Sequence, residues 1–155
     1  MKMLKILKQQ LIGVLLCSLL QTSLAYADDI AVIVGVNTDI SQLSAKQIQR
    51  IFLRKERVSN QGHRWIPVNL RAQQRLRTIF SDQLLQKDRY ALERYWNEQY
   101  FNGISPPYVL ASEEAVLRFV SKTPYALGYV LSCHLDERVR VVYRLHIDSH
   151  ESNCP

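Results

Sequence analysis

The sequence contains few of the features that mark an enzyme. Its 155 residues include five glycines, five prolines and three cysteines. It has no Gly-x-Ser-x-Gly nucleophile motif, no glycine-rich phosphate loop and no Cys–His pair in a recognisable catalytic setting. It also has no internal repeat and no low-complexity tract. We therefore expect one small globular domain that is not an enzyme and uses no cofactor.

The sequence also lacks long hydrophobic segments, apart from one extended apolar run near its start. This run, 11–20, is too short to cross a membrane, which needs about 20 residues. It follows Lys2, Lys5 and Lys8 and precedes the small-residue pattern that ends at Ala27, an order typical of a secretory signal peptide. We expect cleavage after Ala27, a mature domain over 28–155 in the periplasm, and no membrane insertion after cleavage.

The charge is only modestly positive. The formal net charge of the whole chain is +6 at pH 7, and removal of the three lysines in residues 1–27 leaves 6 − 3 = +3. Proteins that hold nucleic acid usually need a stronger basic surface. Export and this small charge together exclude a nucleic-acid partner from the prediction.

Two cysteines remain once the signal peptide, with Cys17, is removed. Cys133 and Cys154 are 154 − 133 = 21 positions apart, and a pair in an exported chain favours a disulfide. In the chain-entropy picture such a bond contributes about 3 kcal/mol of stability and fixes the polar tail to the domain. Two unpaired thiols remain the alternative.

A metal site near the end of the chain is not predicted. His146, His150 and Cys154 are spaced by four, as ligands on a helix would be. However, the polar segment between them is a poor helix former, and Cys154 is already assigned to the disulfide. No metal is therefore expected.

Strands and helices are expected to alternate along the mature chain. Ser44 and Gln47 form a capping box, and Leu43 is placed to pack on Ile48, so a helix should begin at this point. The predicted strands lie at 30–36, 65–70, 127–131 and 139–145, and the other predicted helices begin near 71 or 72, after 88 and after 112. This alternation predicts an α/β domain.

Several segments resemble the phosphate-binding proteins of ABC transporters. The segment IQRIFLRK at 48–55 resembles their I-F-L-G-K element, and PYALGYV at 124–130 resembles P-G-A-I-G-Y-V. Between them, 80–84 and Tyr95-Trp96 fall in the family's order, and 101–107 resembles a short, single-lobe branch. The resemblance implies a single periplasmic-binding-protein-like lobe, with a central mixed sheet flanked by helices, that binds phosphate for transport or sensing.

Two residues depart from the family at its glycine positions. Arg54 stands where the first motif has glycine, and Tyr125 stands where the second does. A left-handed backbone there would cost a bulky residue about 1 kcal/mol or more. Either the two turns differ from those of the family, or the strain is tolerated.

The family's phosphate-binding turn, Arg-x-Asp-Gly-Ser-Gly-Thr, is also replaced. The corresponding segment reads NLRAQQRLR at 69–77. A helix start offers free N–H groups and a favourable dipole, and arginines four apart on one helical face can present two guanidinium groups to an anion. The candidate anion-binding residues are Asn69, Arg71, Gln73 and Arg75; an ordinary solvated helix face is the alternative.

A second functional hypothesis comes from six aromatic residues concentrated between 90 and 108. They can form part of the core or, in a lobe without its partner lobe, a docking surface for another envelope protein. The six are Tyr90, Tyr95, Trp96, Tyr100, Phe101 and Tyr108. The sequence thus leaves two functions open: binding of phosphate or a similar oxyanion, and a ligand-free adaptor that docks to a transporter, sensor or other envelope partner.

Overall fold

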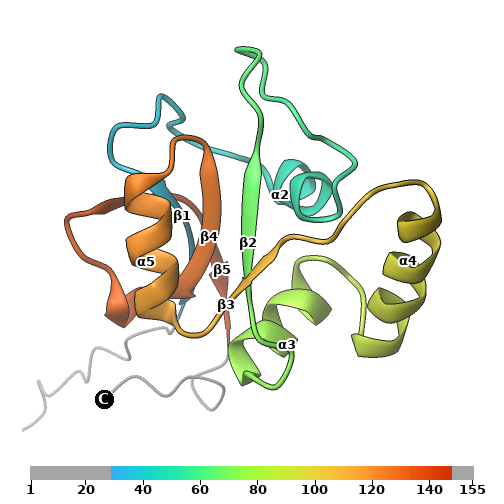
Figure 1. Ribbon diagram of the computed structural model, residues 1–155. Coiled ribbons are helices and arrows are strands. Elements are labelled where there is room, and N and C mark those ends of the chain that lie inside the picture. Colours follow the sequence, from blue (N-terminus) through green and yellow to red (C-terminus); the bar gives the residue numbers. More distant parts are fainter. Residues whose placement is uncertain (1–28, 148–155) are drawn as a thin grey trace, which may run out of the picture.

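The computed structural model describes residues 29–147. The predicted signal peptide and Cys154 lie outside these residues. Along the chain the strands are β1 (Asp29–Gly35), β2 (Ile66–Leu70), β3 (Tyr108–Leu110), β4 (Ala126–Leu131) and β5 (Val139–His146). The helices are α2 (Ala45–Phe52), α3 (Arg75–Gln83), α4 (Arg89–Phe101), α5 (Glu113–Lys122) and a short 3-10 turn, η1 (Ser132–His134) (Figure 1).

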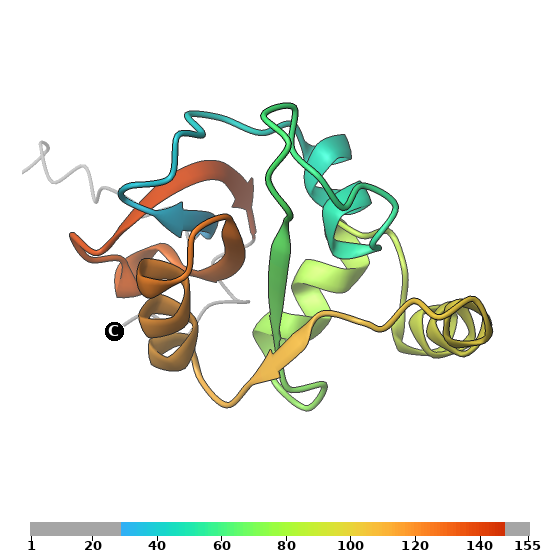
Figure 2. The same ribbon diagram turned by 45° about the horizontal axis from the view of Figure 1, so that its top comes forward.

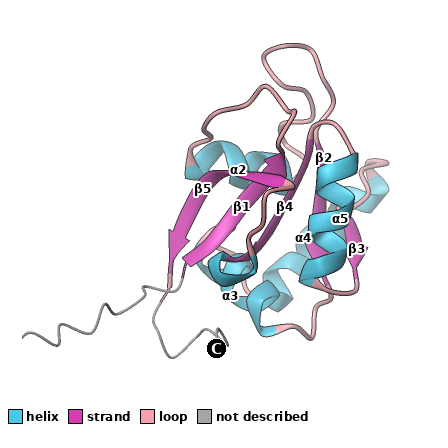
Figure 3. Cartoon of the chain, turned by 90° about the vertical axis from the view of Figure 1, so that its left-hand side faces the viewer, coloured by secondary structure: helices cyan, strands magenta, loops and turns pink. Residues whose placement is uncertain are grey.

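The strands form one mixed sheet in the order β3-β2-β4-β1-β5. β2 runs parallel to β3 and β4, whereas β1 runs antiparallel to β4 and β5. Figure 3 shows β5, β1, β4 and β2 side by side in this order. The predicted α/β class with a central mixed sheet flanked by helices is confirmed.

The helices cover both faces of the sheet. Neighbouring residues of a strand point to opposite faces. At Gly128 of β4 an added Cβ would meet Val116 and Val120 of α5, whereas the ring of Tyr129 packs on Phe80 of α3. α5 therefore covers one face of the sheet, and α2 and α3 cover the other (Figure 1).

Helix α4 projects away from the sheet (Figure 2). Leu92 is its one buried residue, and its polar anchor is the hydroxyl of Tyr95, which donates to the Leu53 carbonyl at 2.6 Å. Tyr95 and Trp96 pack against the edge of the core as partly buried residues. Much of α4 consequently remains in contact with water.

The predicted helix starts are confirmed at three places. At Ser44 the capping box is complete, because its hydroxyl accepts from the Gln47 N–H at 3.3 Å and its own N–H donates to the Gln47 side chain at 3.0 Å. Asp88 and Ser112 cap α4 and α5 as expected. The prediction for α3 is wrong: the helix begins at Arg75, because residues 71–74 form a turn closed by the Gln74 N–H on the Arg71 carbonyl.

Arg54 and Tyr125 both adopt the left-handed backbone that glycine would take freely, with φ values of 58° and 57°. Both residues therefore take the strained backbone, and the fold tolerates this strain. Among residues 29–147, no helix is both long and apolar enough to cross a bilayer.

Candidate functional site

The predicted anion-binding residues lie where β2 passes into α3. Open α/β sheets commonly bind ligands in the crevice beyond the carboxyl ends of parallel strands, and β2 and β4 are such a pair. A crevice of about 280 Å³ is found at this edge. It is lined by Gln74, Arg75, Leu76, Ser112, Glu113, Leu131 and His134.

The start of α3 offers backbone donors. Gln74 occupies the N-cap position but makes no capping hydrogen bond within the described chain; its side-chain amide instead donates to the Ala111 carbonyl at 2.8 Å. The first turn of α3 also holds no acidic residue. The first N–H groups of a helix have no partner within the helix, and they lie at the positive end of its dipole. This end of α3 therefore favours an anion.

The two predicted arginines do not share a helical face. Arg71 lies in the turn before α3, and Arg75 is the first helical residue. Both side chains are exposed, as is that of Gln73. The premise that Arg71 and Arg75 are four apart on one helix is therefore wrong, and their guanidinium groups come instead from a turn and a helix start.

Asn69 is placed differently from the other three predicted residues. It lies within β2, is 3% exposed, and its side-chain oxygen accepts from the hydroxyl of Tyr129 at 2.5 Å. Asn69 thus contributes to the interior of the lobe and is not part of the exposed surface to which Arg71 and Gln73 belong.

Sequence analysis did not single out Arg77 of α3, which lines a separate cavity together with Ser81 and Glu93. Its side chain is largely buried, and its Nη1 atom has no hydrogen-bond partner among the described residues. Burial lowers the pKa of Arg77, and burial raises the pKa of Tyr129. The one signal in the sequence was the third arginine of the run at 71–77, which simple helical periodicity does not distinguish from a solvated residue.

An internal carboxylate enters the same crevice. Glu113, the first residue of α5, accepts from the Leu131 N–H at 2.6 Å and lies 3.0 Å from the Nδ1 atom of His134. It occupies a position where a bound anion could have accepted the same N–H. Glu113 therefore reduces the positive potential on the α5 side of the crevice, and the α3 side remains the more favourable for an anion.

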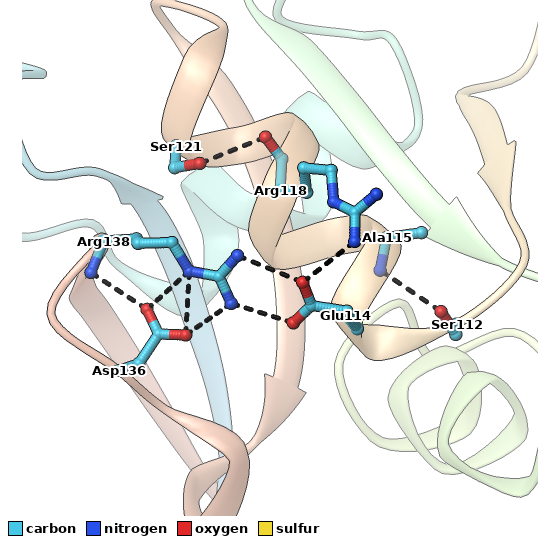
Figure 4. Close-up of polar contacts among 7 residues, drawn as sticks. All are labelled: Ser112, Glu114, Ala115, Arg118, Ser121, Asp136 and Arg138. Carbon is cyan, nitrogen blue, oxygen red and sulfur yellow. Dashed lines mark hydrogen bonds and ion pairs between the residues drawn. The ribbon is translucent and has the colours of Figure 1, made fainter.

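The neighbouring charges of α5 are already satisfied. Arg138 donates to both carboxylate oxygens of Glu114, at 3.1 and 2.8 Å, and also to Asp136 (Figure 4). These hydrogen bonds lower the pKa of Glu114 and of Asp136 and raise the pKa of Arg138. This network links α5 to the loop before β5 and leaves little charge for a ligand.

The aromatic segment divides between core and surface. Tyr95 and Trp96 pack on the core, whereas Tyr100 is 74%, Phe101 88% and Tyr108 68% exposed. Tyr95 and Trp96 thus belong to the edge of the core, and a docking surface formed by the exposed residues stays a prediction.

The predictions that involve cysteine and metal receive no test here. Cys133 lies in η1, but Cys154 lies outside the described residues, so their disulfide stays a prediction. Residues 29–147 contain no group of three or more His, Cys, Asp or Glu side chains that could hold a metal ion.

A scan against protein-family models finds no match, and a search of curated proteins finds none either. Solved structures do match, and they define the fold as that of phosphate ABC transporter substrate-binding proteins. One such protein, from Clostridium perfringens with bound phosphate, matches with a TM-score of 0.62 and 18% identity over 75% of this chain and 45% of its own.

Two further structures agree with this match. An ABC-type phosphate transport receptor from Vibrio cholerae gives a TM-score of 0.60 and 16% identity, over 75% of this chain and 46% of its own. PstS from Borrelia burgdorferi gives a TM-score of 0.54 and 16% identity, over 70% of this chain and 42% of its own. The chain spans less than half the length of each structure, as a single lobe would. At these identities the likeness shows the fold alone.

Proposed function

We propose that this protein binds phosphate or a similar oxyanion non-covalently, at the turn between β2 and α3, in connection with transport or sensing in the periplasm. The observation that carries the proposal is the start of α3. It has no side-chain cap within the described chain, no acidic residue in its first turn, and exposed arginines at Arg71 and Arg75. It also lies in a lobe whose fold occurs in a protein with bound phosphate.

Binding would be electrostatic and would involve no bond making or breaking. The N–H groups of the first turn of α3 would donate to the anion, and Arg71, from the preceding turn, would add a guanidinium group. Arg77, in the same first turn of α3, adds positive potential, because its buried charge is poorly screened by solvent. Glu113 opposes the anion from the α5 side, so we expect modest affinity.

The test is calorimetric titration of the purified, phosphate-free protein with phosphate, sulfate and a small organic phosphate. We expect saturable binding at micromolar concentration, weakened at least tenfold (about 1.4 kcal/mol) by Arg71→Ala with Arg75→Ala. The control is Arg89→Ala with Arg94→Ala, which removes the same charge from the exposed surface of α4. No heat up to millimolar ligand from the folded protein would contradict the proposal.

A second candidate function is supported by the exposed aromatic residues. Tyr100 and Phe101 at the end of α4, with Tyr108 and Val109 on the edge strand β3, are large hydrophobic residues in contact with solvent. Aromatic residues are enriched at protein interfaces, so an adaptor would dock through this surface. If it does, Tyr100→Ser with Phe101→Ser abolishes cross-linking to the envelope partner and leaves phosphate titration unchanged.

A further inference from the structure

A second cavity lies at the opposite end of β2. Its volume is about 450 Å³, within the range of roughly 300–1,000 Å³ typical of small-molecule sites. Arg54, Arg57 and Arg64 line it together with Trp65, and the segment 103–108 between α4 and β3 forms another wall. We call this cavity the arginine pocket.

Tertiary folding brings the three arginines together. Arg54 follows the end of α2. Residues 55–65 then form a loop that folds back on itself before β2 begins, which we call the excursion. Val58 bridges Arg64 in antiparallel fashion, and the Trp65 N–H donates to the Arg57 carbonyl at 2.9 Å. This short ladder places Arg57 and Arg64 on adjacent arms beside Arg54.

The charges in the arginine pocket lack neutralising partners. No carboxylate lines it, and within residues 29–147 the side chains of Arg57 and Arg64 form no hydrogen bond or ion pair. The nearby acid in the sequence, Glu56, is paired with Arg50 at 3.2 Å. Burial lowers the pKa of Arg54, and repulsion from Arg64 and Arg57 lowers it further. Repulsion among the three charges is therefore not offset by a carboxylate, and a bound anion would relieve it.

Two buried donors in the arginine pocket are also unsatisfied. The Nε atom of Arg54 and the indole Nε1 atom of Trp65 have no hydrogen-bond partner in the described part of the chain. Trp65 is only 1% exposed, and Arg54 uses its Nη1 atom to donate to the Trp65 carbonyl at 3.2 Å. Unpaired buried donors are uncommon in folded proteins and call for an explanation. Both donors lie beneath the wall of the pocket and add to its excess of positive potential, because no acceptor in the described chain neutralises them.

Of the three non-glycine residues with positive φ in the described chain, two lie at or beside this pocket, and the third, Gln86, lies between α3 and α4. Arg54 itself has a φ of 58°, and Tyr125 has a φ of 57°. Tyr125 supports the excursion, because its ring stacks on His63 at 4.2 Å and its hydroxyl donates to Gln61 at 3.0 Å. Strained non-glycine residues persist where the surrounding structure requires them, often at functional sites. Here both strained side chains contribute to the pocket or to its supporting loop.

We propose that the arginine pocket binds a compact polyanion of the diphosphate type. Three guanidinium groups without carboxylate partners match a ligand with two or more charged oxyanion groups, and 450 Å³ exceeds what one phosphate needs. The site is separate from the one proposed at the β2–α3 turn. Trp65 and Arg71 flank the five residues of β2, so they are six positions, or roughly 20 Å, apart along the extended chain.

The first test is titration with pyrophosphate, followed by the fluorescence of Trp65. The chain has two tryptophans, so Trp96→Phe leaves Trp65 as the single reporter. We expect a saturable signal change, with affinity at least tenfold higher for pyrophosphate than for inorganic phosphate at equal ionic strength. Arg57→Gln with Arg64→Gln, both at exposed positions, should weaken pyrophosphate binding at least tenfold.

The matched control is Arg89→Ala with Arg94→Ala, which removes the same charge from the exposed surface of α4, outside both proposed sites. This variant should bind pyrophosphate as the unmodified protein does. Three results would each overturn the proposal for the arginine pocket. These are an equal loss of pyrophosphate affinity in the two double variants, no loss of affinity in Arg57→Gln with Arg64→Gln, and no saturable fluorescence signal. Phosphate binding that depends on Arg71 and Arg75 is measured separately, so the two proposals can fail independently.

The second test uses Arg54→Gly. Glycine adopts a φ of 58° without strain, so the substitution removes a guanidinium group while relaxing the backbone. If Arg54 is retained for a ligand, the variant binds pyrophosphate at least tenfold more weakly, and its melting temperature is unchanged or higher. A lower melting temperature with unchanged binding would mean that Arg54 serves the fold alone, and would overturn the proposal.

Discussion

Tyr129 is the residue on which the interior of the lobe is organised. Its ring stacks on that of Phe80, with ring centroids 3.8 Å apart. It also packs at an angle against the ring of Phe52, with centroids 5.9 Å apart. Its hydroxyl bonds to Asn69 of the neighbouring strand, across the interface between β4 and β2. One side chain therefore joins two strands and two helices.

Removing this hydroxyl should destabilise the fold. Tyr129→Phe leaves the buried oxygen of Asn69 without its donor, and an unsatisfied buried polar group typically costs about 1–3 kcal/mol. Urea denaturation should show a decrease of this size in the free energy of unfolding. The double variant Tyr129→Phe with Asn69→Leu should regain only part of it, because the unpaired oxygen is then removed but the Leu70 N–H, which donates to the same hydroxyl at 3.5 Å, still lacks that acceptor. No decrease in the single variant would contradict the assigned hydrogen bond.

The same hydroxyl predicts a pH dependence. Burial raises the pKa of Tyr129 above the value of about 10 in the unfolded chain. Below pH 10 both states are protonated. Above it the unfolded chain loses the proton first, so stability falls by up to about 1.4 kcal/mol per pH unit. Denaturation between pH 9 and 11 should show a shallower fall in Tyr129→Phe, because the other tyrosines titrate equally in both proteins.

At the scale of elements, the contact of α5 with β4 depends on a missing side chain. An added Cβ at Gly128 would lie 2.5 Å from Val116 and 3.0 Å from Val120, both in α5, and 3.1 Å from Val68 in β2. Such distances are too short for carbon atoms, so a larger residue would push the helix away from the sheet.

We predict that Gly128→Ala lowers the free energy of unfolding by about 1–3 kcal/mol, as overpacking usually does. Thermal or urea denaturation measures the effect. Adding Val116→Ala removes the methyl group that the new Cβ would meet. The double variant should therefore lose less unfolding free energy than the sum of the losses in the two single variants. Strictly additive effects would show that this contact does not limit the approach of α5.

At the scale of the whole molecule, the predicted disulfide would hold the end of the chain against the domain. Cys133 lies in η1, directly after β4. We expect the Cys133–Cys154 bond to contribute about 3 kcal/mol. The melting temperature should fall on reduction, and Cys133→Ser should remove this sensitivity to reductant.

Mass spectrometry after alkylation gives an independent reading. Under non-reducing conditions the mature chain should take up no alkylating agent, and after reduction it should take up one group at each of the two cysteines. Alkylation of both thiols without reduction would contradict the disulfide.

The sequence by itself determined the features whose causes lie within a few residues. The capping box at Ser44 and Gln47 depends on groups three positions apart, and the caps at Asp88 and Ser112 are equally local. The buried strand β1 follows from a continuous apolar run. The α/β class then follows from the alternation of such elements, because each must bury an apolar face against another.

The tertiary structure alone decided the start of α3 and the state of Asn69. The Gln74 side chain reaches the Ala111 carbonyl 37 positions away, which helps set where the turn ends. Asn69 is buried because Tyr129, 60 positions away, supplies its partner. Neither contact leaves a periodic signal in the sequence.

The arginine pocket has the same origin. Arg54, Arg57 and Arg64 look like ordinary solvated residues one by one, and the segment 103–108 that completes the wall lies some forty positions further on. Local propensity acts over about one turn of helix, whereas convergence of like charges depends on how the α2–β2 excursion packs beside the α4–β3 link. The sequence thus determined which elements form, and long-range packing determined which side chains meet.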